Sequence, residues 1–290
     1  MKRILYWLRL ALLSVVLVFV VAGAIVYLLS ERLLRQTYAV AGVEVEVPGD
    51  SQSVSEGHRL ALVRGCSGGC HGATVEGGVF IDNPLLARLV APNLTAAVRR
   101  YSNAELERII RRGVRPDGVS VIGMPSEMFT GLTDEDLGDI LAYLRSVPPR
   151  SGPAPARRLG PVARLAFVAG KLRPAAELVR RATLLTNIWP HDGDSTVRGA
   201  YLARTSCTEC HGLDLRGSDP APDLRIAAGY SFEAFSGLMR RGEGLGNREL
   251  PLMSSVARQR FSHFTDQELR ELYVYLIARG AEVDTTSLYP

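Results

Sequence analysis

The hydrophobic pattern of the chain begins with a nearly unbroken apolar run from Leu10 to Leu29. Its interruptions are small or weakly polar residues such as Ser14 and Gly23. About 20 apolar residues are needed for a helix to cross the hydrocarbon core of a bilayer. The run therefore predicts a membrane-spanning helix, within an anchor segment that we assign to residues 1–36.

A cleaved signal peptide is the alternative interpretation of this N-terminal segment. Three basic residues lie within the first nine, and Ala22-Gly23-Ala24 resembles a cleavage site. However, the apolar run is longer than an ordinary signal-peptide core and continues almost to Glu31. An uncleaved signal-anchor is therefore favoured. The excess of basic residues before the run then predicts a single-pass protein of the inner (cytoplasmic) membrane, with a cytoplasmic N-terminus and periplasmic domains after residue 36.

Apolar residues at helical spacing recur near the end of each half of the chain. They occupy positions 137, 140, 141 and 144 in the first half and 269, 272, 273 and 276 in the second. Thr265 with Glu268 forms a capping box before the second set, and Thr133 with Asp136 forms a near version before the first. Residues 57–64 and 199–204 are also predicted to be helical. No strand pattern competes with these, so the predicted fold class is all-α.

An internal repeat relates the two halves by a constant shift of 129 residues. This shift places Tyr101-Ser102 on Tyr230-Ser231, and Met124 on Met253. A chain of 290 residues is long enough for two domains. We therefore predict two tandem modules after the anchor, at residues 37–149 and 195–290, joined by a basic linker at 150–194.

Charge is unevenly distributed along the chain, whose net charge is +4. The anchor segment and residues 150–181 are basic, and the latter carries eight Lys or Arg against Glu177 alone. The two modules are mildly acidic and show no nucleic-acid recognition motif, which argues against nucleic-acid binding. The basic segment could lie along the membrane surface, dock an acidic partner, or cover the space between the modules.

All four cysteines fall in two tight clusters, each followed directly by a histidine: Cys66, Cys70 and His71, and Cys207, Cys210 and His211. The second cluster is C-x-x-C-H, the attachment signature of a c-type haem. Two intervening residues place both thiols on one side of a short helical turn, and the histidine supplies an imidazole to iron.

The first cluster has three residues between its cysteines, and Gly68-Gly69 supplies the backbone freedom that the extra residue needs. A disulfide in each cluster, a redox dithiol pair, or one zinc ion bound by four thiolates are the alternatives. None of them explains why a histidine follows the second cysteine both times. The two clusters therefore predict two covalently bound haem c groups.

A c-type haem of the electron-transfer kind usually takes the thioether of a methionine as its sixth ligand. Met124 and Met253 are related by the shift of 129, whereas Met128 and Met239 face Ala257 and Ile110. Met124 and Met253 are therefore the predicted iron ligands opposite the two histidines. Met128 and Met239 are predicted to lie in the core or on the surface.

The two halves resemble class I cytochrome c domains over about residues 55–147 and 195–280. The resemblance rests on residues 199–202 before the second cysteine cluster, on Ala91-Pro92-Asn93-Leu94-Thr95 and on Met124-Pro125. The whole chain is similar to membrane-bound multi-haem cytochromes, including the cytochrome subunits of alcohol and gluconate dehydrogenases. It departs from them in the first haem motif, in having no Pro after Met253, and in lacking a third haem module.

The resemblance implies roles for two prolines and for the protein as a whole. The carbonyls of Pro92 and Pro222 are expected to accept the ring N–H of the haem histidines. The expected function is that of a non-enzymatic electron carrier between a dehydrogenase or quinol-oxidising complex and an oxidase or soluble cytochrome. A di-haem peroxidase is the alternative, but it needs an iron position open to peroxide, and paired Met ligands argue against that.

Overall fold

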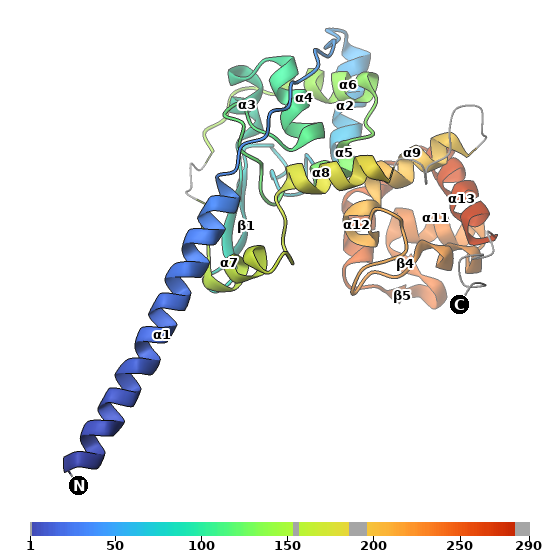
Figure 1. The fold of residues 1–290 in the computed structure, drawn as a ribbon. Coiled ribbons are helices and arrows are strands. Elements are labelled where there is room, and N and C mark those ends of the chain that lie inside the picture. The colour runs from blue at the N-terminus through green and yellow to red at the C-terminus, as the bar shows by residue number, and fades with distance from the viewer. Residues whose placement is uncertain (1, 153–156, 186–195, 282–290) are drawn as a thin grey trace.

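The structure is a computed structural model that describes residues 2–152, 157–185 and 196–281. It is mostly helical, as predicted, and consists of one long helix followed by two compact helical modules that lie side by side (Figure 1). Parts of the predicted linker, at residues 153–156 and 186–194, lie outside the described residues.

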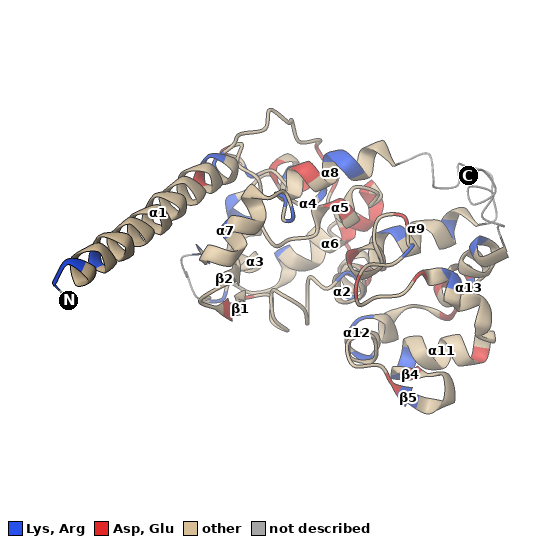
Figure 2. Ribbon diagram, turned by 60° about the horizontal axis from the view of Figure 1, so that its bottom comes forward, with Lys and Arg blue, Asp and Glu red and all other residues tan. Residues whose placement is uncertain are grey.

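The long helix α1 (Lys2–Leu34) extends away from both modules (Figure 1). Its 33 residues correspond to about 50 Å of helix. Among the described residues it is the one helix that is long and apolar enough to cross a membrane, and its apolar window is fully exposed. Basic residues lie at both ends of α1, and its middle carries no charge (Figure 2).

Five helices build the first module around two apolar clusters. They are α2 (Ser51–Val63), α3 (Leu94–Arg100), α4 (Asn103–Arg112), α5 (Ser126–Phe129) and α6 (Asp134–Ser146). Helix α2 packs closely on α6 because Gly57 faces the α6 backbone. A Cβ at Gly57 would lie 1.8 Å from the carbonyl oxygen of Asp139, so only glycine permits this approach.

A small antiparallel sheet in the first module was not predicted from the sequence. Strands β1 (Gly78–Asn83) and β2 (Ala87–Ala91) form a hairpin, and β3 (Arg158–Leu159) pairs with β2. The side chain of Asn83 accepts hydrogen bonds from the backbone N–H groups of Leu85 and Leu86, which closes the turn. Most side chains of β1 are exposed, so the segment lacks the apolar alternation by which a strand is recognised.

The segment between the modules packs on the anchor and on the first module. After β3, helix α7 (Pro161–Val168) lies against α1, and α8 (Ala175–Leu184) lies against α5 and α4. At Gly113 an added Cβ would lie 2.9 Å from the Cβ of Ala175, so α8 starts in close contact with the end of α4. The connection is therefore an ordered part of the molecule over its described residues.

The second module repeats this plan. Its helices are α9 (Val197–Ser206), α10 (Thr208–His211), α11 (Phe232–Arg241), α12 (Met253–Gln259) and α13 (Asp266–Ala281), with a short hairpin of β4 (Glu243–Gly244) and β5 (Arg248–Glu249). Helix α9 packs on α13 as α2 packs on α6. Gly199 makes the approach possible, because a Cβ there would lie 2.2 Å from the carbonyl oxygen of Glu271.

The predicted offset of 129 residues is confirmed in the backbone. Helices α4 and α11 begin and end at equivalent positions, with Ser102 and Ser231 as N-caps whose side chains accept backbone hydrogen bonds. Both helices end at a glycine, Gly113 and Gly242, in the left-handed conformation. The threonine caps predicted before α6 and α13 are also present.

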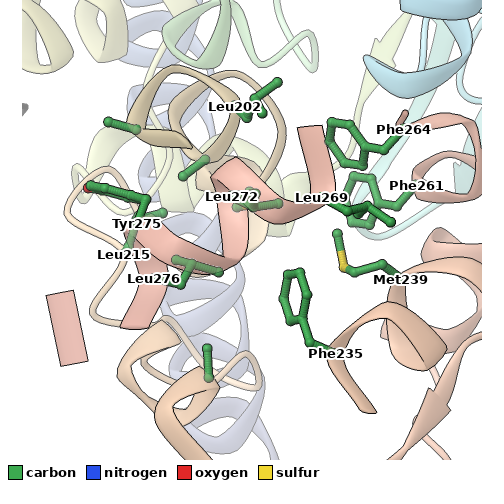
Figure 3. Close-up of a cluster of buried hydrophobic side chains, with 14 of the residues drawn as sticks. Leu202, Leu215, Phe235, Met239, Phe261, Phe264, Leu269, Leu272, Tyr275 and Leu276 are labelled. Carbon is green, nitrogen blue, oxygen red and sulfur yellow. The ribbon is translucent and has the colours of Figure 1, made fainter. Parts of the chain in front are cut away.

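The core of the second module surrounds Met239, which is 2% exposed. Figure 3 shows its side chain pointing toward Phe235, Phe261 and Leu269. Met128 of the first module is fully buried. Met128 and Met239 are therefore both core residues, one of the two places the sequence allowed for them.

Candidate functional site

The first cysteine cluster follows α2 on a run of tight turns at residues 64–71. Gly65 and Gly68 have φ angles of 76° and 74°, which favour glycine. A Cβ at Gly69 would lie 2.4 Å from the carbonyl oxygen of Gly65. The glycines thus absorb the extra residue between Cys66 and Cys70, as the sequence predicts.

The second cluster lies at the junction of α9 and the single-turn helix α10. Cys207 ends α9 and is buried, whereas Cys210 and His211 lie on α10 and are half-buried. The side chain of Thr208 donates to the carbonyl of Arg204, which ties α10 to the preceding helix. A short helical turn therefore presents the second thiol and the imidazole.

None of the four cysteines forms a disulfide. Burial raises the pKa of the Cys66 thiol to about 11 and that of Cys207 to about 12, so both are neutral thiols at pH 7. Within the described residues, no group of three or more His, Cys, Asp or Glu side chains is placed to hold a metal ion. The disulfide and four-thiolate zinc alternatives thus gain no support from the geometry.

Each histidine is oriented by a proline carbonyl. The Nδ1 of His71 donates to the carbonyl oxygen of Pro92 at 2.9 Å, and the Nδ1 of His211 donates to that of Pro222 at 2.8 Å. Because a carbonyl can only accept, Nδ1 carries the proton and Nε2 keeps its lone pair. Burial lowers the pKa of both imidazoles, although the carbonyl bonds act in the opposite direction. Both rings are therefore neutral and able to ligate a metal through Nε2.

A cavity of about 470 Å³ in the first module brings the predicted residues together. Cys66, His71, Pro92 and Met124 all line it. Apolar side chains form most of its remaining wall, including Leu94, Val98, Leu106, Phe129, Leu137 and Leu141. A cavity of this size and apolar character is typical of a cofactor site. An imidazole, a thioether and a thiol on one apolar cavity fit the donor set of a covalently bound haem.

In the second module the corresponding methionine packs against the apolar cluster that contains the corresponding cysteine. Met253 begins α12 and is half-buried against the apolar cluster that contains Cys207 and Leu215. Met239 lies in the same cluster but is almost fully buried. Met253 therefore retains the exposure that a side chain needs to reach a bound group at the edge of the core.

Three arginines that the sequence did not single out also line the first cavity: Arg64, Arg115 and Arg157. The side chain of Arg64 is fully buried; its Nη2 lies 3.5 Å from Asp136 Oδ2, and neither Nε nor Nη2 has a hydrogen-bond partner. Buried donors of this kind are costly unless another group satisfies them. Arg64 lies two residues before Cys66, and the shift of 129 places Gly193 opposite it, so the repeat did not single it out.

The two cysteine clusters face each other across the contact between the modules. Arg64 Nη1 donates to Ser206 Oγ at 2.5 Å, which links a residue two positions before Cys66 to the residue directly before Cys207. Arg260 of the second module donates to the carbonyl of Val63 at 3.1 Å and pairs with Glu209 at 3.0 Å. Its guanidinium would lie 3.1 Å from a Cβ at Gly65. The two candidate sites are thus neighbours.

Comparison with known proteins identifies both modules. The model of the family described as Cytochrome c matches residues 54–148 and 196–278. The fructose dehydrogenase cytochrome subunit of Gluconobacter japonicus is 29% identical over 266 residues, which cover 80% of this chain and 54% of that protein.

Two further relatives match smaller parts of the chain. The cytochrome c subunit of the alcohol dehydrogenase (quinone) of Gluconacetobacter polyoxogenes is 32% identical over 32% of this chain and 22% of its own length. A nicotinate dehydrogenase subunit of Pseudomonas putida is 28% identical over 61% of this chain and 15% of its own length. The chain thus spans about half the length of the fructose dehydrogenase subunit and less of the others.

Proposed function

The chain belongs to the cytochrome c family, and from this membership we propose that it is a membrane-anchored electron carrier with two covalently bound haem c groups. The observation that carries the proposal is the arrangement repeated in both modules. In each, a histidine oriented by a proline carbonyl follows a cysteine pair, and the methionine at the shared offset lies with the first cysteine of that pair on one apolar cavity or cluster.

The residues of each module have separate roles in this proposal. Cys66 with Cys70, and Cys207 with Cys210, would hold the two haems through thioether bonds. When bound, each haem iron supplies one-electron chemistry between its ferrous and ferric states.

The iron ligands proposed for the first module are His71 and Met124, and those for the second are His211 and Met253. The proline carbonyls keep each imidazole in the tautomer that ligates through Nε2. The apolar cavity wall excludes water from the first site.

The named relatives support a dehydrogenase as the electron donor, because each is a subunit of a dehydrogenase. A quinol-oxidising complex as donor, and an oxidase or soluble cytochrome as acceptor, complete the proposal. These relatives give no support to the di-haem peroxidase alternative. With a methionine available to each iron, the protein is proposed to transfer electrons without catalysing a reaction of its own.

The proposed location is the inner membrane, with the modules on the periplasmic side. Helix α1 supports this location, because its apolar window is long enough to span a bilayer and is fully exposed.

The number of haems can be tested by intact mass spectrometry of the denatured holoprotein. We expect two haem additions in the parent protein and one in a variant with Cys66→Ser and Cys70→Ser. The matched variant with Cys207→Ser and Cys210→Ser should also keep one. A single addition in the parent, lost with Cys207 and Cys210, would show that the three-residue spacing does not attach haem.

A further inference from the structure

A second cavity, of about 850 Å³, lies between the end of α1 and residues 157–165 and shares Arg157 with the first cavity. One wall is the last three turns of α1, and the other is formed by β3 and the start of α7. Nothing in the electron-transfer proposal uses this space.

The cavity is apolar at one end and basic at the other. Gly23 and Val26 line the end that lies within the apolar run, and Arg35, Arg157 and Arg158 line the other. Six residues separate Arg35 from Leu29, where the run ends, which corresponds to about 9 Å along the helix. In a spanning orientation, the apolar end therefore lies at the depth of the acyl chains and the arginines lie at the depth of the headgroups.

The basic end holds more positive charge than its acidic group can balance. Arg164 donates to Ser30 Oγ and Glu31 Oε1, both at 2.8 Å, and its guanidinium lies 4.3 Å from the ring centroid of Tyr27. Arg35 also pairs with Glu31, at 2.9 Å. The one carboxylate that lines the cavity is thus shared by two arginines.

Arg157 and Arg158 make no side-chain ion pair or hydrogen bond with another described residue, although both line this cavity. Burial, followed by repulsion from Arg115, lowers the pKa of Arg157, so an anion beside it would be favoured. The cavity end therefore carries two guanidinium groups that form no ion pair with a described carboxylate, although Glu31, already paired with Arg164 and Arg35, attracts Arg157 at longer range. An arginine fork is well suited to phosphate oxygens.

These arginines lie on the side of α1 that the positive-inside tendency assigns to the periplasm, where basic residues are normally depleted. We propose that the cavity binds one anionic phospholipid from the membrane leaflet that faces the modules. The lipid phosphate contacts Arg35, Arg157 and Arg158, and an acyl chain lies along Gly23 and Val26. This inference rests on the membrane anchoring included in the proposed function.

The bound lipid would hold the connecting segment against the anchor. Val162 and Leu165 of α7 are 49% and 56% exposed, and both lie beside the anchor helix, so α7 can enter the interfacial region of the bilayer. Headgroup and chain would then contact α1 and α7 together. The first module would be fixed relative to the membrane surface at two points instead of one.

The test is native mass spectrometry of the full-length holoprotein, delipidated in mild detergent and titrated with phosphatidylglycerol or phosphatidylcholine. We expect one tightly bound phosphatidylglycerol and at least about tenfold weaker binding of phosphatidylcholine. R35Q/R158Q should weaken phosphatidylglycerol binding by about tenfold or more. The matched variant R180Q/R181Q removes the same charge from α8, outside the cavity, and should bind like the parent.

Three outcomes would overturn the proposal: equal binding of the two lipids, equal loss in both variants, or displacement of phosphatidylglycerol by an equal concentration of inorganic phosphate. The masses in the same spectra show how many haems are attached and whether N-terminal residues have been removed. A missing haem would contradict the proposed function and leave the lipid result to be judged separately. A mature protein lacking residues 1–24 would overturn both the anchor and the lipid site.

Discussion

Replacing Glu268 by Gln should weaken the contact between the modules. Glu268 lies in the first turn of α13, and its carboxylate accepts two hydrogen bonds from Arg59 of α2, at 2.7 and 3.1 Å. It also accepts from the backbone N–H of Thr265 at 2.8 Å, which caps the helix. The Glu268 side chain is 7% exposed, so this is a nearly buried bidentate ion pair across the interface.

The expected loss of folding stability depends on which interactions Arg59 and Thr265 keep after the substitution. Removing one member of a buried ion pair costs about 3–5 kcal/mol when the other charge is left alone. Here Arg59 retains Glu56 at 2.5 Å, and the Gln amide oxygen can still accept the cap hydrogen bond. We therefore expect a loss of about 2–3 kcal/mol. For a protein of this size, that loss lowers the melting temperature by about 4–12 °C.

The loss of stability caused by Glu268→Gln should become smaller as the pH falls. Burial alone would raise the pKa of Glu268, but the hydrogen bonds from Arg59 and Thr265 outweigh it and hold the pKa below its usual range. A carboxyl with a lowered pKa stabilises the folded state above its unfolded pKa of about 4.3, and this contribution is lost as pH falls through the folded value. The difference between parent and Glu268→Gln should therefore be full at pH 7 and shrink below about pH 4.

The assay is thermal unfolding of the holoprotein followed by circular dichroism at pH 7 and at successively lower pH. Glu271→Gln is the control, because Glu271 lies on the same helix and its side chain accepts only from Gln267, at an exposed position. It should change stability by no more than about 0.5 kcal/mol. If Glu268→Gln costs no more than the control at pH 7, the modules do not dock through α2 and α13 as described.

Three further outcomes are expected. Met253→Ala should keep its haem attached but open the iron to carbon monoxide. Met239→Ala should lower the free energy of unfolding by about 2–5 kcal/mol and leave the haem spectrum unchanged. The reverse result would contradict the ligand assignment. Gly65→Ala should cost about 1–2 kcal/mol in urea unfolding, because its φ of 76° is left-handed and the Arg260 guanidinium occupies the space of a Cβ. Deleting residues 1–36 behind a cleavable signal should give a soluble, red protein, and retention in the membrane fraction would point to a second attachment.

Local patterns carried the sequence predictions that the structure confirms. The capping box of Thr265 with Glu268 and the apolar face of α13 each depend on residues within a few positions of one another. The repeat added a second, independent copy of each signal. The repeat also distinguished Met253 from Met239 as the predicted iron ligand, which local composition alone could not do.

Contacts between distant residues were not predictable in this way. Arg64 and Ser206 are 142 positions apart, and Arg260 and Val63 are 197 apart, so no spacing rule links them. The burial of Arg64 depends on a neighbouring module that its own sequence surroundings do not encode. The hairpin was missed for a different reason, since most side chains of β1 are exposed and β2 has only five residues in which to show an alternation.

The spacing between the histidine and the proline that orients it differs between the two modules. His71 and Pro92 are 21 positions apart, whereas His211 and Pro222 are 11 apart, and the longer segment of the first module contains the β1–β2 hairpin. The second module, described from 196 to 281, has only an isolated bridge between His211 and Pro222.

Strand β3 of the connecting segment pairs with β2 of this hairpin, and α7, which follows β3, packs on α1. The longer segment of the first module therefore joins that module to the helix that we assign to the membrane. Thermal motion of the first module relative to α1 should be restricted as a result.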